Sequence, residues 1–158
     1  MLPKQTRKRR KQAIKPIKMI LDDDYFKEHR ELKGIFREAL LCYKVGAEIA
    51  SHAMAVSFIE RFLRNEFEEF DKNITLFRFL EEHGDEVFKN TQLNSELHEL
   101  RKQRNDNLHE NIIVIELLTL KDIINSTSSN AKSALKALTL AASIYKQVTQ
   151  TLKTKVTQ

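Results

Sequence analysis

Apolar residues recur every three or four positions after residue 22, the spacing that places side chains on one face of an α-helix. The first run predicts helix over residues 32–62, with Gly34 and Gly46 either dividing it or permitting close packing. Its apolar positions are Leu32, Phe36, Ala39, Leu40, Tyr43, Ala47, Ala50, Met54, Phe58 and Phe62. The pattern therefore indicates a helical core made by long segments.

Shorter periodic segments follow the first run. A helix from Ile74 to His83 is expected to end at Gly84 as a C-cap, and Asn94 or Ser95 is expected to cap the next helix. Residues 112–115 fit an extended connector or more helix, and Thr119 opens the last helix with a signal resembling a capping box. No strand signal or internal repeat recurs, so we predict an all-α helical bundle of about four or five helices.

Charge divides the chain into two parts. Residues 1–18 hold 8 of the 27 basic residues and no acid, which leaves 19 basic and 22 acidic residues, a net charge of −3, in the remainder. Like charges repel, so residues 1–20 are predicted to form a flexible basic arm before a single helical domain over residues 21–158. The arm fits three roles: RNA binding, contact with an acidic partner, or solubility. Its candidate RNA contacts are Arg7, Lys8, Arg9, Arg10 and Lys11.

Several function classes are disfavoured by composition. Cys42 is the only cysteine, so it is expected to be a small buried residue and no intrachain disulfide can form. The longest apolar runs are too short to cross a bilayer and no secretory h-region is present, so we expect a cytoplasmic protein without a membrane partner. The histidines outside residues 101–110 lack metal-ligand spacing, so no metal or cofactor is predicted, and His52 is expected to be packed and hydrogen-bonded.

The segment over residues 101–110 carries the most specific chemistry, because it combines arginine with a titratable imidazole. On an ideal helix Arg104 falls within a face made by leucines, where its charge must meet an acid, a bound anion or an open cleft. Asn105 and His109 are one turn apart and are therefore neighbours. Arg104 and His109 are about 140° apart, so His109 lies at a helix end or bend, or the pair comes from two chains.

Arg104-Asn105 followed by His109 resembles the motif of the HEPN superfamily, which consists of small all-α domains in which four to six residues separate an arginine from a histidine; here four residues intervene. Many members are metal-independent endoribonucleases of toxin–antitoxin systems, antiphage defence and RNA-guided CRISPR effectors. The resemblance implies that His109 is the general acid/base and that Arg104 holds the scissile phosphate. Asn105 would orient the phosphate or His109. Arg101 and Lys102 would add RNA contacts. It further implies a homodimer, an RNA substrate and an antitoxin or other protein partner.

Less specific interpretations stand beside this one. Arg104 also fits a structural ion pair with Glu60, Glu66 or another acid, and His109 fits a capping or surface residue. The phenylalanines at helical spacing, Phe77 among them, are expected in the core rather than as stacking platforms. The alternative function is a non-catalytic helical module that binds nucleic acid or a protein through the basic arm and the motif face.

Overall fold

The computed structural model describes residues 2–71, 73–88, 91–114 and 120–156, while the side chains of residues 107–128 and 155–156 lie outside this description. The described part of the chain contains eight α-helices, one 3₁₀ helix and no strand, which confirms the all-α class. The elements are α1 (Lys4–Ala13), α2 (Lys15–Lys18), η1 (Met19–Asp22), α3 (Tyr25–Glu28), α4 (Arg30–Val45), α5 (Glu48–Glu66), α6 (Leu76–Phe88), α7 (Thr91–Val114) and α8 (Leu120–Val156).

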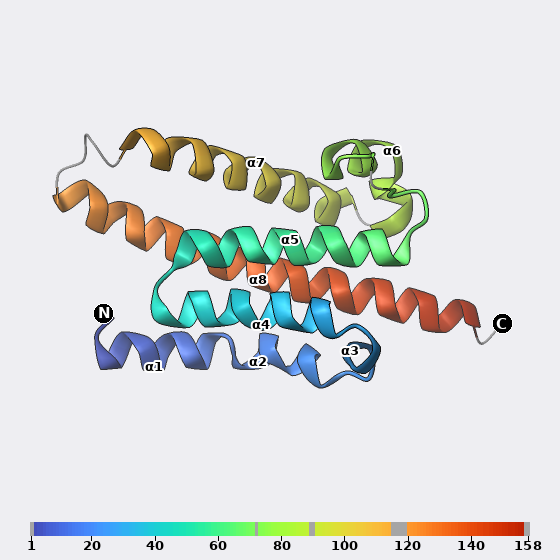
Figure 1. Cartoon of the computed structure of the whole chain (residues 1–158), viewed down its shortest axis with the longest axis horizontal. Helices are drawn as coiled ribbons and strands as arrows, with labels where there is room; N and C mark the ends of the chain where they lie inside the picture. Colours follow the sequence, from blue (N-terminus) through green and yellow to red (C-terminus); the bar gives the residue numbers. More distant parts are fainter. Residues whose placement is uncertain (1, 72, 89–90, 115–119, 157–158) are drawn as a thin grey trace.

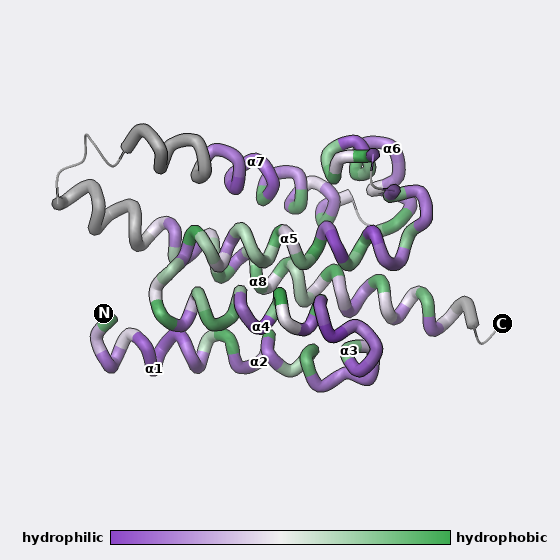
Figure 2. Tube along the Cα trace, in the orientation of Figure 1, coloured by the Kyte–Doolittle hydropathy of each residue, from purple (hydrophilic) through white to green (hydrophobic). Residues whose placement is uncertain are grey.

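Helix α5 lies at the centre and packs against α4, α7 and α8. Helices α1 and α2 run along α4 at one edge of the bundle, and α7 follows the opposite edge with α6 beside its first turns (Figure 1). Figure 2 shows hydrophilic residues over most of α1 and mixed hydropathy along α5 and α8. None of the helices, over the residues described, is both long and apolar enough to cross a membrane.

The predicted helical run over residues 32–62 is two helices, because Gly46 ends α4. Gly46 has a φ of 95°, a left-handed conformation that glycine adopts without steric cost, and its N–H donates to the Cys42 carbonyl at 3.1 Å. Gly34 lies inside α4 instead. The turn lets the apolar faces of α4 and α5 meet, and the ring centroids of Phe36 and Phe58 are 4.7 Å apart.

Two predicted helix ends are wrong. Helix α6 continues through Gly84 to Phe88, and α7 begins at Thr91 rather than at a cap on Asn94 or Ser95. Gly84 is buried where α6 meets α7, and a Cβ there would lie 2.3 Å from Asn94 Oδ1. Asn94 Nδ2 also donates to the Asp85 carboxylate at 3.0 Å. Gly84 is therefore a point of close helix approach. Thr119 lies outside the described residues.

The basic N-terminal segment, expected as a flexible arm, is helical and packed on the bundle. Arg10 is only 8% exposed, and its guanidinium donates to the Glu48 carboxylate and to the Tyr43 carbonyl at 2.8 Å. Four apolar side chains behind it are buried in the same core: Ile14, Ile17, Ile20 and Leu21. Their burial and one internal ion pair offset the repulsion among exposed lysines, which water and salt screen. The segment therefore adds helices beyond the predicted four or five.

Replacing Arg10 with alanine should detach α1 from α4, because the buried Glu48 carboxylate would lose its charged partner. We expect a loss of up to about 3–5 kcal/mol in the free energy of unfolding, less if α1 swings away and exposes Glu48. Urea unfolding measures the loss, and amide hydrogen exchange should show reduced protection in α1. The control is the exposed neighbour, Arg9→Ala, expected within about 0.5 kcal/mol of wild type. Equal effects of the two substitutions would contradict this role for Arg10.

Candidate functional site

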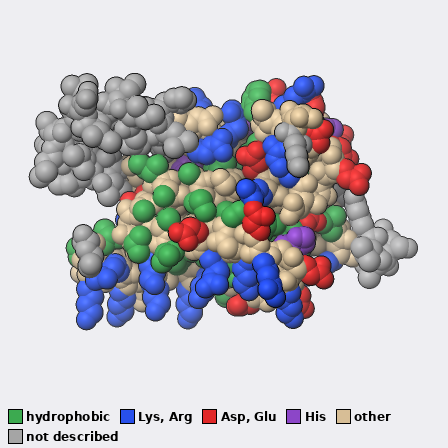
Figure 3. All heavy atoms as spheres, in the orientation of Figure 1, with side chains coloured by type: hydrophobic (Ala, Val, Ile, Leu, Met, Phe, Trp, Pro, Cys, Tyr) green, Lys and Arg blue, Asp and Glu red, His purple; other side chains and the backbone are tan. Residues whose placement is uncertain are grey.

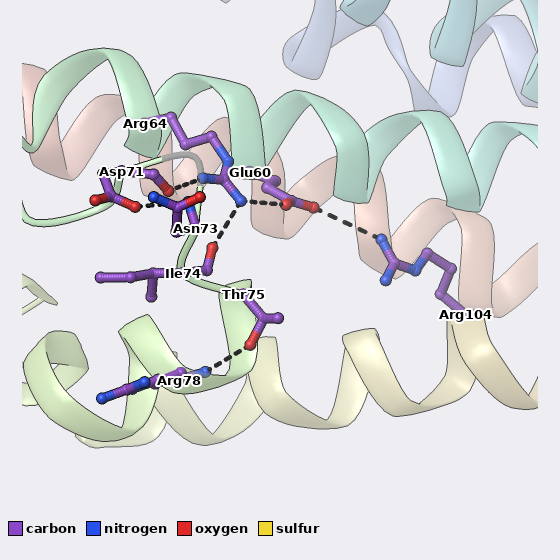
Figure 4. Close-up of polar contacts among 8 residues, drawn as sticks. All are labelled: Glu60, Arg64, Asp71, Asn73, Ile74, Thr75, Arg78 and Arg104. Atoms are coloured by element: carbon purple, nitrogen blue, oxygen red, sulfur yellow. Dashed lines mark hydrogen bonds and ion pairs between the residues drawn. The ribbon is translucent and has the colours of Figure 1, made fainter.

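A pocket of about 610 Å³ opens between α5, the segment that leads into α6, and α7. Its polar side chains come from all three elements and include three arginines but a single carboxylate. Figure 4 shows that carboxylate, Glu60, between Arg64 and Arg104. The lining residues are Glu60, Arg64, Asn73, Ile74, Thr75, Leu76, Phe77, Arg101, Arg104 and Asn105. The pocket therefore carries net positive charge where two residues of the predicted motif lie.

Arg64 holds the segment between α5 and α6 in place. Its guanidinium donates to the Glu60 carboxylate at 3.0 Å, to the Ile74 carbonyl at 2.8 Å and to the Asp71 carbonyl. It also lies 3.9 Å from the centroid of the Phe70 ring. Three of its five N–H donors are used in these contacts, so Arg64 forms a wall of the pocket rather than a free anion ligand (Figure 4).

Arg104 is held much less tightly. Its Nη1 lies 3.9 Å from Glu60 Oε2, at the outer limit of an ion pair, and its side chain is 24% exposed. Nε and Nη2 donate to the neighbouring Asn105 Oδ1 at 3.3 and 3.2 Å. Both anticipated surroundings of Arg104, an acid and an open cleft, are present. Of the two acids named as possible partners, Glu60 is the one in contact, while Glu66 accepts a hydrogen bond from Tyr25.

The predicted leucine face is confirmed where it is described, since Leu93, Leu97 and Leu100 are buried. This burial fixes the rotation of α7 and turns Arg101 and Arg104 toward the pocket.

Arg101 has no ion pair among the described residues. Its guanidinium carbon lies 4.7 Å from the centroid of Phe77, and its Nε is buried without a hydrogen-bond partner. Phe77 is 41% exposed, so its predicted place in the core is wrong, and the ring of His98 meets it edge-on at 5.6 Å. The pocket therefore contains a flat aromatic surface beside an available guanidinium.

The remaining predicted site residues are more scattered. His109 follows Asn105 by one turn of α7, and its side chain lies outside the described residues. Lys102 is exposed and does not line the pocket. The predicted RNA contacts of the N-terminus lie on α1, at the other edge of the bundle, where Arg7, Lys8, Arg9 and Lys11 are exposed. Arg10 is instead buried and paired, which removes it from any surface contact.

His52 fixes α7 from behind the pocket. Its Nε2 lies 3.1 Å from the Leu100 carbonyl and its Nδ1 2.9 Å from Ser133 Oγ, so one buried side chain joins α5, α7 and α8. Burial lowers the pKa of His52, the hydrogen bond to Leu100 opposes that shift, and the positive charge of Arg104 lowers the pKa further. The predicted packed histidine is confirmed. At 2% exposure it positions α7 and is closed to substrate.

The arrangement suits an anion with several oxygens. Planar guanidinium groups bind phosphate oxygens in a bidentate manner, and two of the three arginines in this pocket keep donors available. Within the described part of the chain no cluster of three or more His, Cys, Asp or Glu side chains is suited to a metal ion. A phosphate-bearing ligand is therefore the chemistry that the pocket fits best.

Sequence reasoning did not find Arg64, Asn73 or Thr75, nor the exposure of Phe77. The one local signal is the spacing of Glu60 and Arg64, four apart on a helix, which predicts an ion pair but no pocket. The other residues come together through the turn between α5 and α6, which periodicity does not describe.

Comparison of the chain with protein-family models, with curated proteins and with solved structures finds no match.

Replacing Glu60 with glutamine should strengthen anion binding, because the carboxylate competes with a ligand for Arg104. We expect several-fold tighter binding of adenosine monophosphate, about 1 kcal/mol for a partly exposed pair, by isothermal titration calorimetry. Arg104→Gln should weaken binding. The matched control is Glu81→Gln, an exposed acid on α6 outside the pocket. Equal tightening by Glu60→Gln and Glu81→Gln would assign the effect to net charge and contradict a role for the contact between Glu60 and Arg104.

His52 should make stability fall at acidic pH. Its lowered pKa means that the unfolded chain takes up a proton first as pH falls below about 6.5. The stabilising contribution is therefore complete above that pH and is lost progressively toward the lower pKa of the folded state. Urea unfolding at pH 7.5 and 5.5 should show a larger loss for wild type than for His52→Gln, which itself costs about 1–3 kcal/mol through its hydrogen bonds. Equal losses would contradict this role.

Proposed function

We propose that this protein is a metal-independent endoribonuclease of the HEPN type, acting as a toxin or antiphage-defence effector. The observation that carries the proposal is Arg104 beside Asn105 at an open cationic pocket, one turn before His109 on the same helix. The all-α architecture is compatible with a HEPN-like bundle. Loose contact between Arg104 and Glu60 supports phosphate binding, because a phosphate displaces a 3.9 Å contact at little cost.

In this mechanism the RNA supplies its own nucleophile. His109 takes the proton of a 2′-hydroxyl, and the 2′-oxygen attacks the adjacent phosphorus. The bond from phosphorus to the 5′-oxygen breaks as that oxygen takes the proton from the imidazolium of His109. The products are a 2′,3′-cyclic phosphate and a 5′-hydroxyl. Arg104 neutralises charge that grows on the phosphoryl oxygens, and the exposed face of Phe77 offers a base a stacking surface.

Two copies of the chain are expected to form each site. Residues five apart on a helix differ by about 140° in direction, and α7 is helical from Thr91 to Val114, so one helix does not aim Arg104 and His109 at one atom. A two-fold arrangement that brings two α7 helices together places Arg104 of one copy opposite His109 of the other.

Purified protein should cleave RNA in the presence of EDTA and leave cyclic phosphate ends, as judged by gel electrophoresis and mass spectrometry. His109→Ala should slow cleavage by about 10²–10⁴-fold and Arg104→Ala by about 10²–10³-fold. Arg78→Ala is the control, because Arg78 is exposed on α6 and pairs only with Glu82 among the described side chains. Cleavage that requires Mg²⁺, or that survives both pocket substitutions, would exclude the mechanism.

Mixing the two inactive variants distinguishes a site formed by two copies of the chain from a site formed within one chain. A dimer of Arg104→Ala with His109→Ala retains one intact pair if the residues come from different copies, so part of the activity should return. A site within one chain gives no recovery. RNA binding by the wild-type protein without any cleavage would instead favour the non-catalytic helical module, for which the unpaired Arg101 is the supporting observation.

A further inference from the structure

A second cationic feature lies at the edge of the bundle that carries α1 and α2. A groove of about 890 Å³ runs between these helices and α4. Figure 3 shows a row of Lys and Arg side chains along this edge with hydrophobic side chains beside it. Six cations and one acid, Glu38, line the groove; the cations are Lys8, Lys11, Lys15, Lys18, Arg37 and Lys44.

One rim of the groove is a ladder of four lysines on a nearly continuous helix. Lys8, Lys11, Lys15 and Lys18 are three, four and three residues apart, the spacing that keeps side chains on one helix face. Backbone hydrogen bonds carry the helical pattern across the junction, from Ile14 N–H to the Arg10 carbonyl at 3.1 Å and from Lys18 N–H to Ile14 at 2.9 Å. The ladder therefore spans about 15 Å.

The opposite rim comes from α4, where Arg37 and Lys44 are two turns apart. All six cations are exposed, and none forms an ion pair with another described side chain. By contrast, Arg10, which points the other way from α1, is buried and neutralised by Glu48. The charge on the groove is thus uncompensated within the part of the chain that the structure describes, and it favours a polyanion.

The floor of the groove is apolar and has room. Leu40 is buried at the bottom while Leu41 is 48% exposed, and a Cβ added to Gly34 would meet no atom within 4 Å. An apolar floor between two cationic rims fits a single nucleic-acid strand whose phosphates contact the rims and whose bases and sugars face the floor. A duplex hides its base faces, so it would leave the floor uncovered.

We propose that the groove between α1–α2 and α4 binds single-stranded nucleic acid through its phosphodiester backbone. No aromatic ring is among the residues that line the groove, so base stacking is absent and binding is independent of sequence. The inference stands apart from the proposed cleavage, because DNA lacks the 2′-hydroxyl that cleavage needs and offers the groove the same phosphates.

The test measures binding by fluorescence anisotropy with full-length protein and labelled oligothymidylate of about fifteen nucleotides. If all six cations contact phosphates, log K should fall with log salt at a slope of about −4, a loss of roughly 300-fold between 50 and 200 mM salt. Lys11→Gln with Lys15→Gln should reduce the slope by about 1.4. The control pair, Lys132→Gln with Lys136→Gln, removes the same charge from exposed positions on α8 and should leave the slope unchanged.

A charge-neutral variant tests the groove itself. Gly34→Leu places a side chain in open space, so the protein should fold while the strand loses about tenfold or more in affinity with its salt slope kept. Gly34→Ala is the matched control and should bind as wild type does.

Further ligands test whether the groove distinguishes RNA from DNA and whether it binds nucleic acid or an acidic protein. Oligouridylate with 2′-O-methyl groups, which is protected from cleavage, should bind like the DNA strand if the backbone alone is read. Three results would each overturn the proposal. Duplex DNA could bind as tightly as the single strand, polyglutamate could displace the strand at equal charge concentration, or the two lysine pairs could have equal effects. Displacement by polyglutamate would assign the groove to an acidic protein.

Discussion

The burial of α5 on several sides is the constraint on which the other features of this protein depend. Six of its apolar side chains are completely buried: Ala55, Val56, Phe58, Ile59, Phe62 and Leu63. Burial of this kind is the main favourable term in folding, and it fixes the helix against α4, α7 and α8 together. Three polar residues along α5 are thereby held in fixed positions. Glu48 holds α1, His52 holds α7 and α8, and Glu60 faces the arginine pocket.

Periodicity predicted the helical class and the leucine face of α7, because both depend on spacing along one helix. It also placed Arg104 on that face, where the structure has the guanidinium at an open pocket. Features that depend on contact between helices were not predicted. Gly84 looked like a helix end because glycine often is one, yet its missing side chain admits Asn94 from α7. Phe77 follows core spacing, but it lies just beyond the turn into α6 and remains exposed.

The N-terminal segment shows why charge counted along a sequence is a poor guide to order. Eight cations suggested repulsion, but α1 and α2 turn their apolar residues inward and most of their charges toward water. Order then depends on a few buried groups, Ile14, Ile17 and the pair of Arg10 with Glu48. The same packing that orders the segment also aligns its lysines, so a stretch that composition would assign to disorder becomes a defined surface.

Glu60 contacts two arginines with its two oxygens, Arg64 at 3.0 Å and Arg104 at 3.9 Å. Its negative charge is therefore divided between a residue that secures the chain between α5 and α6 and a residue that faces the pocket. An anion that takes over Arg104 leaves the whole carboxylate to Arg64, which tightens its hold on the carbonyls of Asp71 and Ile74. By thermodynamic linkage, the factor by which the anion strengthens the contacts of Arg64 is also the factor by which those contacts strengthen binding of the anion. One shared carboxylate thus couples the ordering of a loop to the capture of a ligand.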